Sequence, residues 1–245
     1  MSRNSPKSLV ALFFFSLIIG IISQEAFAFE RPDSVPETAN KKVKYFRPAA
    51  IIVPSAFVLY GCLKPVIPAI ENLDNRIMER MMTRYPDNNT KVDDYLQWVP
   101  SASIYVMDAF KVKTRHTFLE HLAIDAGSII ITGGAGFVMR KISGNMEVYN
   151  QNNTRFPSGH TANAFRGAEI VYQELKISHP LLSYSGYLVA TAVGLLRIYN
   201  KEHFLTEVIA GAGLGMLSTK FTYLVFDKVK AHKKRKSHAS SLSSR

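Results

Sequence analysis

The sequence predicts an all-α protein, an integral membrane helical bundle of about five to six helices. Hydrophobic residues make up 47% of the 245-residue chain, which by itself would suit a soluble protein. Their distribution is different, because they gather in long apolar runs with the charged residues between them. Long apolar runs joined by polar loops are typical of membrane-spanning helices.

The first residues have the pattern of a secretory signal peptide. Arg3 and Lys7 precede an apolar run from Leu9 to Ile22, and Ala26-Phe27-Ala28 follows with the small-x-small spacing of a cleavage site. The run is short for a span, which favours a cleaved signal over residues 1–28. An uncleaved N-terminal hydrophobic segment is the alternative.

Two weaker apolar segments come next. The run from Ala49 to Ile70 is interrupted by Lys64 and three prolines, so we expect a kinked span there. Residues 71–93 are charged, and Tyr95 to Phe110 form a moderately apolar helix candidate. If the signal is cleaved and both segments cross fully, the basic loop at 111–116 falls outside the cytoplasm. Either one segment is interfacial or re-entrant, or the signal assignment is wrong.

The second half of the chain holds the clearest helices. The clearest span is Leu119 to Met139, and we expect further helices over Thr161–Leu175, Leu181–Leu196 and His203–Phe226. Glycines in the first and last of these would let membrane helices pack closely. They are Gly133, Gly134, Gly136, Gly211 and Gly215. The glycine-rich run at 133–136 is no nucleotide loop, because no strand precedes it.

Basic residues indicate the orientation of the chain, whose net charge is +11. A basic loop lies at 111–116, and a lysine-rich cluster from Lys228 to Lys236 follows the last apolar run. Four candidate spans separate them, so both lie on one side, which the positive-inside rule makes cytoplasmic. The loops at 141–160 and 197–203 then face the other side. A nucleic-acid-binding tail is the alternative for the cluster, but we expect no nucleic-acid partner. Residues 227–245 are predicted to be a basic, disordered tail.

Cysteine and histidine spacing exclude some kinds of site. Cys62 is the only cysteine, which rules out a disulfide within the chain and a cysteine-based zinc site. Five histidines have no partners at metal-ligand spacing, and we interpret them as loop or surface residues. They are His116, His121, His179, His232 and His238.

A first constellation with chemical meaning is Phe156-Pro157-Ser158-Gly159-His160-Thr161, directly before a predicted helix. A helix start presents unpaired N–H groups that bind anions, phosphate especially. Gly159 permits close approach to the backbone. His160 can donate a proton to a leaving oxygen.

A second constellation is Arg197, His203 and Glu207. His203 and Glu207 are four residues apart, so they share one helix face, and the carboxylate can hold one imidazole nitrogen while the other attacks. Arg197 at the end of the preceding helix offers a fork for phosphate oxygens. Arg140, at the end of the 119–139 run, is a further candidate for binding phosphate. Taken alone, it could instead be a snorkelling residue that anchors the helix.

Together these residues resemble the phosphatidic acid phosphatase type 2 / haloperoxidase superfamily, in its bacterial membrane lipid phosphatase type. The resemblance rests on Pro157-Ser158-Gly159-His160 followed by Arg197-x5-His203-x3-Glu207, and it covers residues 45–226. It implies that His203 is a nucleophile forming a phosphohistidine, that Glu207 orients it, and that His160 protonates the leaving group. It implies no metal or other cofactor. The phosphate-binding groups it implies are Arg197, Ser158 and the Gly159 amide.

The first motif of the family departs from its pattern here. The family has Lys-x6-Arg-Pro, and the matching positions in this chain are Arg140, Glu147 and Val148. Glu147 puts a carboxylate where a phosphate-binding arginine is expected, and Arg155 is the candidate to supply the missing charge. Glu207 stands where the family has Asp, which lengthens the side chain by one carbon and puts the position of the histidine in doubt.

The resulting expectation is a membrane phosphatase that hydrolyses a phosphomonoester or diphosphate of a lipid-like substrate. Candidate substrates are phosphatidylglycerophosphate, phosphatidic acid, undecaprenyl diphosphate and a lipid A phosphate. We expect a multi-pass protein of the bacterial inner membrane with its site facing the periplasm. The alternative is a non-catalytic phospholipid-binding protein with a degenerate site. A vanadate peroxidase is disfavoured because those enzymes are soluble, and a transporter leaves the motif spacing unexplained.

Overall fold

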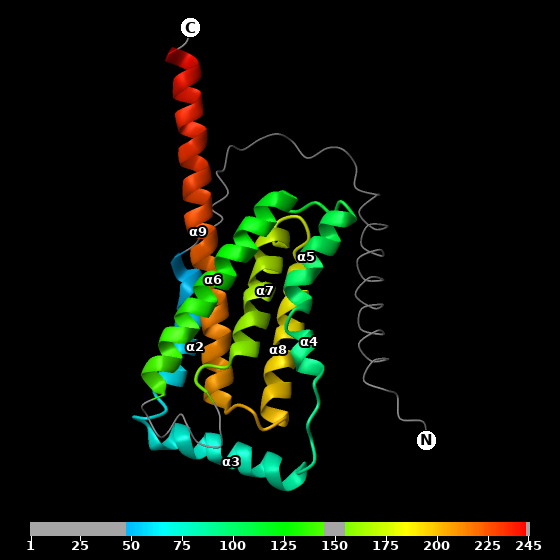
Figure 1. Ribbon diagram of the computed structural model, residues 1–245, viewed down its shortest axis with the longest axis vertical. Helices are drawn as coiled ribbons and strands as arrows, with labels where there is room; N and C mark the ends of the chain where they lie inside the picture. The colour runs from blue at the N-terminus through cyan, green and yellow to red at the C-terminus, as the bar shows by residue number, and fades with distance from the viewer. Residues whose placement is uncertain (1–47, 145–154, 244–245) are drawn as a thin grey trace. The chain divides into compact units, whose positions relative to one another are not determined.

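The computed structural model describes residues 48–144 and 155–243, and within these ranges all regular structure is helical (Figure 1). The prediction of an all-α fold is therefore confirmed. The segments assigned to residues 1–28 and to Glu147 and Val148 lie outside the described residues. The helices are η1 (Pro48–Ile51), α2 (Ile52–Cys62), α3 (Pro68–Arg84), α4 (Val92–Leu96), α5 (Val99–Ala109), α6 (Phe118–Ser143), α7 (Gly159–Leu175), η4 (Leu182–Tyr184), α8 (Ser185–Tyr199) and α9 (Leu205–Ser243).

The region before residue 110 holds more helices than expected. The predicted kinked span is two helices, because α2 ends at Cys62 and α3 restarts with Pro68 at its first position, where a missing N–H costs nothing. A one-turn helix, α4, precedes α5. Helices α2 and α5 have 11 residues each, so neither alone reaches the roughly 20 residues that cross a bilayer.

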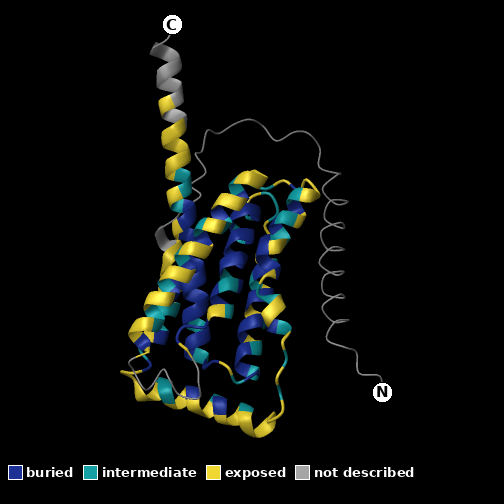
Figure 2. Ribbon diagram, in the orientation of Figure 1, coloured by how far each residue is buried: buried dark blue, intermediate teal, exposed yellow. Residues whose placement is uncertain are grey.

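Helix α7 is the centre of the bundle and packs against α5, α6, α8 and α9 (Figure 1). Figure 2 shows it almost entirely buried. Its buried face includes charged residues as well as alanines, among them Arg166 and Glu169. Each is paired, Arg166 with Asp125 of α6 and Glu169 with Lys220 of α9, which offsets the cost of burying a charge.

Of the five glycines predicted to allow close packing, Gly211 and Gly215 do so, Gly136 is buried beside Leu214 of α9, and Gly133 and Gly134 do not. A Cβ on Gly211 would lie 2.5 Å from the Ser158 carbonyl oxygen, and one on Gly215 would lie 2.2 Å from that of Ala162. Close packing of α9 on α7 thus requires glycine at both positions. By contrast, a Cβ on Gly133 or Gly134 would meet nothing within 4 Å. These two residues face open space instead of a neighbouring helix.

Two helices among the described residues are long and apolar enough to cross a membrane, α6 and the Leu205–Lys233 part of α9. They differ in environment, because the apolar window of α6 is 22% buried and that of α9 is 72% buried. Large apolar side chains cover the outer face of α6, among them Leu119, Ile130 and Phe137. The helices predicted around 161–175 and 181–196 are present as α7 and α8, at 17 and 15 residues.

The two basic segments lie at the same end of the bundle. Arg115, in the basic loop, forms an ion pair with Asp227 of α9, and Lys230 Nζ lies 2.5 Å from Glu120 Oε1 at the start of α6. This agrees with an even number of crossings between them. The prediction of a disordered tail is wrong for 227–243, because α9 continues to Ser243. Lysine, arginine and alanine are good helix formers, so the polar end extends the helix.

Candidate active site

A histidine–glutamate pair lies at the start of α9. His203 Nδ1 is 2.7 Å from Glu207 Oε2, and the same carboxylate oxygen accepts a hydrogen bond from the Phe204 N–H at 3.2 Å. Glu207 is fully buried, and His203 is nearly so. The longer glutamate side chain, a doubtful point in the sequence, therefore does reach the imidazole. Because Nδ1 faces the carboxylate, Nε2 is the nitrogen left for chemistry.

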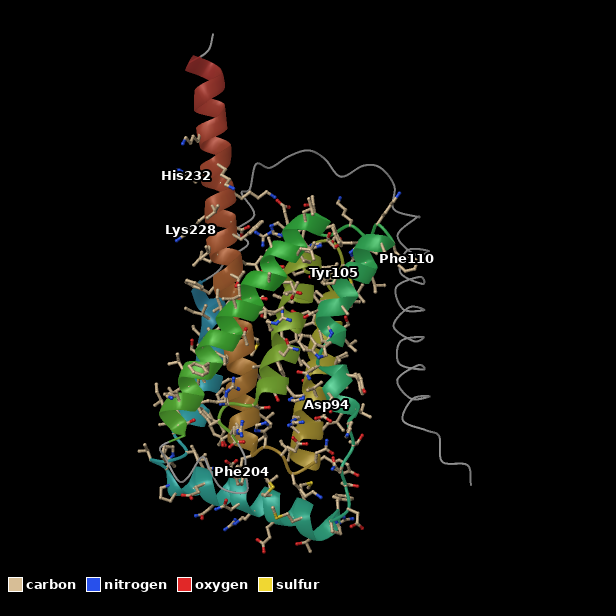
Figure 3. The ribbon with its side chains drawn as sticks, viewed as in Figure 1. Asp94, Tyr105, Phe110, Phe204, Lys228 and His232 are labelled. Atoms are coloured by element: carbon tan, nitrogen blue, oxygen red, sulfur yellow. The ribbon has the colours of Figure 1, made fainter. Side chains whose placement is uncertain are left out.

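The segment that carries His203 is anchored by a buried group of polar residues. Asp74 of α3 accepts hydrogen bonds from the Thr206 N–H at 3.1 Å and from the Thr206 hydroxyl at 2.5 Å. Lys64 Nζ lies 3.2 Å from Asp74 and 3.6 Å from the centre of the Phe204 ring, which Figure 3 labels. Lys64 is completely buried. These contacts fix the segment that directly follows the histidine.

The second motif packs directly on this segment. The Ser158 N–H donates to the Glu207 carbonyl oxygen at 3.0 Å. The Ser158 side chain caps α7, where its hydroxyl lies 2.9 Å from that of Thr161. The capped helix start and the His203–Glu207 pair are thereby joined, and the unpaired N–H groups of the first turn of α7 are brought close to the dyad.

His160 is held from the other side by α4. Its Nε2 lies 2.9 Å from Asp94 Oδ1, and both side chains are partly exposed. Asp94 is labelled in Figure 3, at the same end of the bundle as Phe204. The carboxylate fixes the direction of the ring. A proton donor placed this way meets the chemical requirement for a general acid.

Arg197, at the end of α8, is bound by two carboxylates. One Nη1–H donates to Asp93 Oδ2 at 2.5 Å, and Nη2 pairs with Glu202. Asp93 is buried and also accepts from Asn200 at 3.0 Å, whereas the Glu202 side chain is 47% exposed. The buried Nε–H of Arg197 has no hydrogen-bond partner in the part of the chain that the structure describes. The Nη1 side of the guanidinium is thus fixed by buried Asp93, whereas the Nη2 side is paired with Glu202, whose side chain reaches solvent.

Arg140, at the C-terminal end of α6, extends to the start of α7. Its Nη1 lies 3.6 Å from the position that a Cβ on Gly159 would occupy. Arg140 also lines a cavity with Lys141 and Arg155, so Arg155 lies beside it, as expected for a residue that supplies the missing charge. The guanidinium groups and the helix start together form a cationic region beside Gly159.

Asp93, Asp94 and His160 offer ligand atoms within 4.8 Å of one another and could in principle hold a cation. Asp93 is already committed to Arg197 and Asn200. Its charge is therefore balanced by the protein, and the arrangement is better explained as support for His160 and Arg197.

Several residues at this site were not found from the sequence. Asp93, Asp94 and Glu202 belong to charged stretches that gave no sign of which side chain they bind. Lys64 did give a signal, because a lysine within an apolar run is a functional hypothesis by default.

His116 lies in the loop before α6, as expected, but His121 belongs to α6, so the interpretation as a loop or surface residue is wrong for it, and both side chains are buried. They are 7% and 1% exposed. His121 pairs with Asp108, and both histidines contact Glu174, so burial is compensated by carboxylates far away in the sequence.

Known proteins resemble this chain in the region that carries the site. Residues 126–231 match the family model of the PAP2 superfamily. A lipid A 1-phosphatase of Porphyromonas gingivalis is 31% identical over 159 residues, which is 64% of this chain and 36% of that relative. The chain therefore spans about a third of the relative's length.

Among solved structures, the chain is similar to a transmembrane PAP2-type phosphatidylglycerolphosphate phosphatase from Bacillus subtilis. The identity is 18% and the TM-score 0.43, over 72% of this chain and 97% of that one. The region matched by the family model contains Arg140, the Pro157–His160 motif and the His203–Glu207 pair. Residues 126–231 therefore carry the match to the PAP2 superfamily, in the region where the sequence motifs indicated that resemblance.

Proposed function

We propose that this protein is a membrane phosphatase that hydrolyses a phosphomonoester or diphosphate of a lipid-like substrate through a phosphohistidine on His203. The observation that carries the proposal is the 2.7 Å contact between His203 Nδ1 and buried Glu207. It orients Nε2 as the free nitrogen and stabilises the positive charge that develops on the ring as that nitrogen attacks.

In the first step, His203 Nε2 attacks the phosphorus atom and forms a P–N bond. The bond from phosphorus to the lipid oxygen breaks, and that oxygen takes a proton from His160. Asp94 holds the His160 ring in place during the transfer. The developing charge on the equatorial oxygens is met by Arg140, Arg197 and the first turn of α7.

In the second step, a water molecule replaces the lipid. The now neutral His160 accepts a proton from the water, the water oxygen attacks phosphorus, and the P–N bond breaks. Inorganic phosphate leaves and His203 returns to its starting state. All groups that act in these two steps belong to the protein, the substrate or water, so the mechanism uses no cofactor.

To bind a phosphate, Arg197 has to give up one of its two carboxylate partners, and the structure indicates which one can leave. Asp93 is buried and stays in place, but Glu202 is half-exposed and can move into solvent. The vacated Nη2 and the unpartnered Nε–H then form one donor edge suited to two phosphate oxygens.

We place the protein in the inner membrane of a bacterium, as a multi-pass protein with the site toward the periplasm. The exposed apolar face of α6 supports the membrane location, since contiguous apolar surface of this size is unfavourable in water. The basic loop at 111–116 and the basic C-terminal part of α9 lie at the opposite end, which the positive-inside rule assigns to the cytoplasm. The site then lies at the outer surface, where an amphiphile presents its phosphate.

A second candidate is a phospholipid-binding protein without catalysis. It is favoured by the two carboxylates on Arg197, which compete with a phosphate for the guanidinium. It shares the phosphate site with the enzyme and differs only in lacking turnover.

Phosphate release from a panel of lipid phosphates by the purified protein in detergent tests the proposal, with His203→Ala alongside. Release by the wild type and loss of at least about 10³-fold in the variant is the expected result. Equal release by both would overturn the nucleophile. Binding of a lipid phosphate without release by the wild type would favour the second candidate.

A further inference from the structure

A second cavity lies between α6 and α7, directly beside the phosphate site. Its volume is about 170 Å³, and Arg140, Pro157 and Gly159 line its end nearest the site. A single water needs roughly 10–15 Å³ measured in this way, so the cavity has room for part of a substrate. It reaches the outer face of α6 at Gly133 and Ile129, both exposed.

Thr132 gives this cavity a hydrogen-bonding group with no protein partner. The residue is 8% exposed and lines the cavity. Its buried hydroxyl has no hydrogen-bond partner within the residues that the structure describes. A buried hydroxyl left unpaired costs about 1–3 kcal/mol, so a partner at this position is expected.

The charged group on the cavity wall is already satisfied by the protein. Arg166 donates from all three nitrogens, to Asn163, Asp125, Ser128 and Ser101. A guanidinium has five N–H donors, and these contacts use all five. The lining also has an apolar part, which includes Ile129, Ala162 and Leu214. The cavity is thus built for a neutral group instead of a second anion.

The distance between Thr132 and the phosphate site follows from the helix. Arg140 Nη2 lies 3.6 Å from the position of a Cβ on Gly136, so the guanidinium is level with that residue. Thr132 is one turn earlier, about 6 Å along the helix. In an acylated lipid phosphate, an ester or amide carbonyl is separated from phosphorus by a few bonds, which is a comparable distance. An isoprenyl phosphate has no such carbonyl.

We propose that this cavity binds the part of the substrate next to its phosphate, and that the Thr132 hydroxyl donates to an acyl carbonyl oxygen. The inference rests on the proposed function and narrows its substrate class to acylated lipid phosphates. Gly133 serves this role, because it lines the cavity next to Thr132 and has no side chain to fill it.

The test compares two lipids that differ only at the carbonyls, a diacylglycerol phosphate and its dialkyl ether analogue of equal chain length. Binding is measured by titration calorimetry in detergent on the His203→Ala protein, so that turnover does not interfere. We expect the diacyl lipid to bind about 3- to 10-fold more tightly, and Thr132→Val on the same background to remove the preference. No preference in the parent, or a preference that survives in Thr132→Val, would overturn the inference.

A steric test uses neighbouring glycines as a matched pair. Among the described residues, a Cβ at Gly133 or at Gly134 meets nothing within 4 Å, so a side chain can begin at either position without a clash, but of the two only Gly133 lines the cavity. Gly133→Leu should weaken binding of the diacyl lipid at least about 10-fold. Gly134→Leu should leave it unchanged. Equal binding by the two variants would contradict the assigned cavity.

Phosphate release by the protein with His203 intact separates this inference from the proposed function. Phosphate release without any preference for the acyl lipid in binding would contradict the proposed Thr132 contact but support the phosphatase. A preference for the acyl lipid without phosphate release would support the proposed lipid-binding cavity but contradict the proposed phosphatase activity.

Discussion

Histidine–carboxylate pairs lie at both ends of the bundle, and they differ in how many imidazole nitrogens the protein occupies. At the site end, His203 contacts Glu207 through Nδ1, and His160 contacts Asp94 through Nε2. Within the described residues, no carboxylate pairs with the second nitrogen of either ring, so one nitrogen per ring is left for substrate.

At the opposite end both nitrogens of each ring face carboxylates. His116 has Nδ1 2.8 Å from Glu174 and Nε2 3.5 Å from Asp227. His121 has Nδ1 2.7 Å from Asp108 and Nε2 3.1 Å from Glu174. Figure 3 places Tyr105 and Phe110 toward this end and Asp94 and Phe204 toward the other.

On the proposed mechanism, the same residue types thus build a reactive arrangement at one end and a structural one at the other. A ring with one nitrogen held and the other available can attack or transfer a proton. A ring held at both nitrogens by carboxylates has no nitrogen left for chemistry and serves to stabilise the fold. We therefore expect substitutions at the site end to change turnover and those at the opposite end to change stability.

The largest expected effect is that of Glu207→Gln on turnover. The amide keeps the shape of the side chain but loses the charge that stabilises the His203 ring, and it can select the wrong tautomer. We expect kcat to fall about 10³-fold with an unfolding temperature close to that of the wild type. Phosphate release and thermal unfolding in detergent are measured on the same preparation.

Glu207→Asp is the matched control, because it keeps the charge and shortens the reach. Since the glutamate carboxylate already lies 2.7 Å from Nδ1, the shorter side chain should lower kcat, by about 10-fold. A rise in kcat would mean that glutamate at this position is a defect.

Glu174→Gln should act on stability alone. Its carboxylate contacts His116, His121 and the hydroxyl of Tyr223, and removing the charge leaves two buried histidines without their shared partner. A loss of about 3 kcal/mol is expected, read as a lower unfolding temperature in detergent with kcat unchanged. Glu120→Gln breaks the exposed pair with Lys230 and should cost less than about 1 kcal/mol.

The contribution of His116 to stability should depend on pH. Burial lowers the pKa of this ring, but the hydrogen bonds to Asp227 and Glu174 outweigh it, so the pKa in the folded protein is raised above 6.5. The stabilisation is fully present below about pH 6.5 and is lost as pH rises through the folded pKa. Unfolding temperatures from pH 5.5 to 9 should therefore fall, and His116→Asn should flatten the curve. A wild-type curve that rises over this range would contradict the assignment.

The smallest effect expected is that of Glu202→Gln on substrate binding. Because Glu202 is half-exposed and competes with phosphate for Arg197, its neutralisation should lower KM about 3-fold. Asp93→Asn is the contrasting variant, since it loosens the buried edge of Arg197 and should raise KM. An unchanged KM in Glu202→Gln would mean that phosphate does not use the Nη2 edge.

The sequence was sufficient for the parts of the site that lie close together in the chain. His203 and Glu207 are four residues apart, and helix geometry alone predicts their contact. The helix that begins directly after Ser158 and the packing of Gly211 also follow from local pattern. The prediction failed where a partner comes from a distant helix.

Asp93 is 104 residues from Arg197, and Glu174 is 58 residues from His116. No periodicity encodes such pairs, because each depends on how α4, α7 and the loop before α6 pack. The prediction that Gly133 and Gly134 of α6 pack against a neighbouring helix failed for a related reason. The spacing of small residues permits close packing but does not say which face meets a neighbour, and Gly133 meets a cavity instead.

The most direct test of the proposed mechanism is to trap the phosphorylated protein. Wild-type protein is mixed with a ³²P-labelled lipid phosphate, quenched in alkali that preserves phosphohistidine, and digested for mapping. We expect label on His203 at Nε2, because Glu207 holds Nδ1, and no label in His203→Ala. Label on Nδ1, on another residue, or on none during demonstrable turnover would contradict the mechanism.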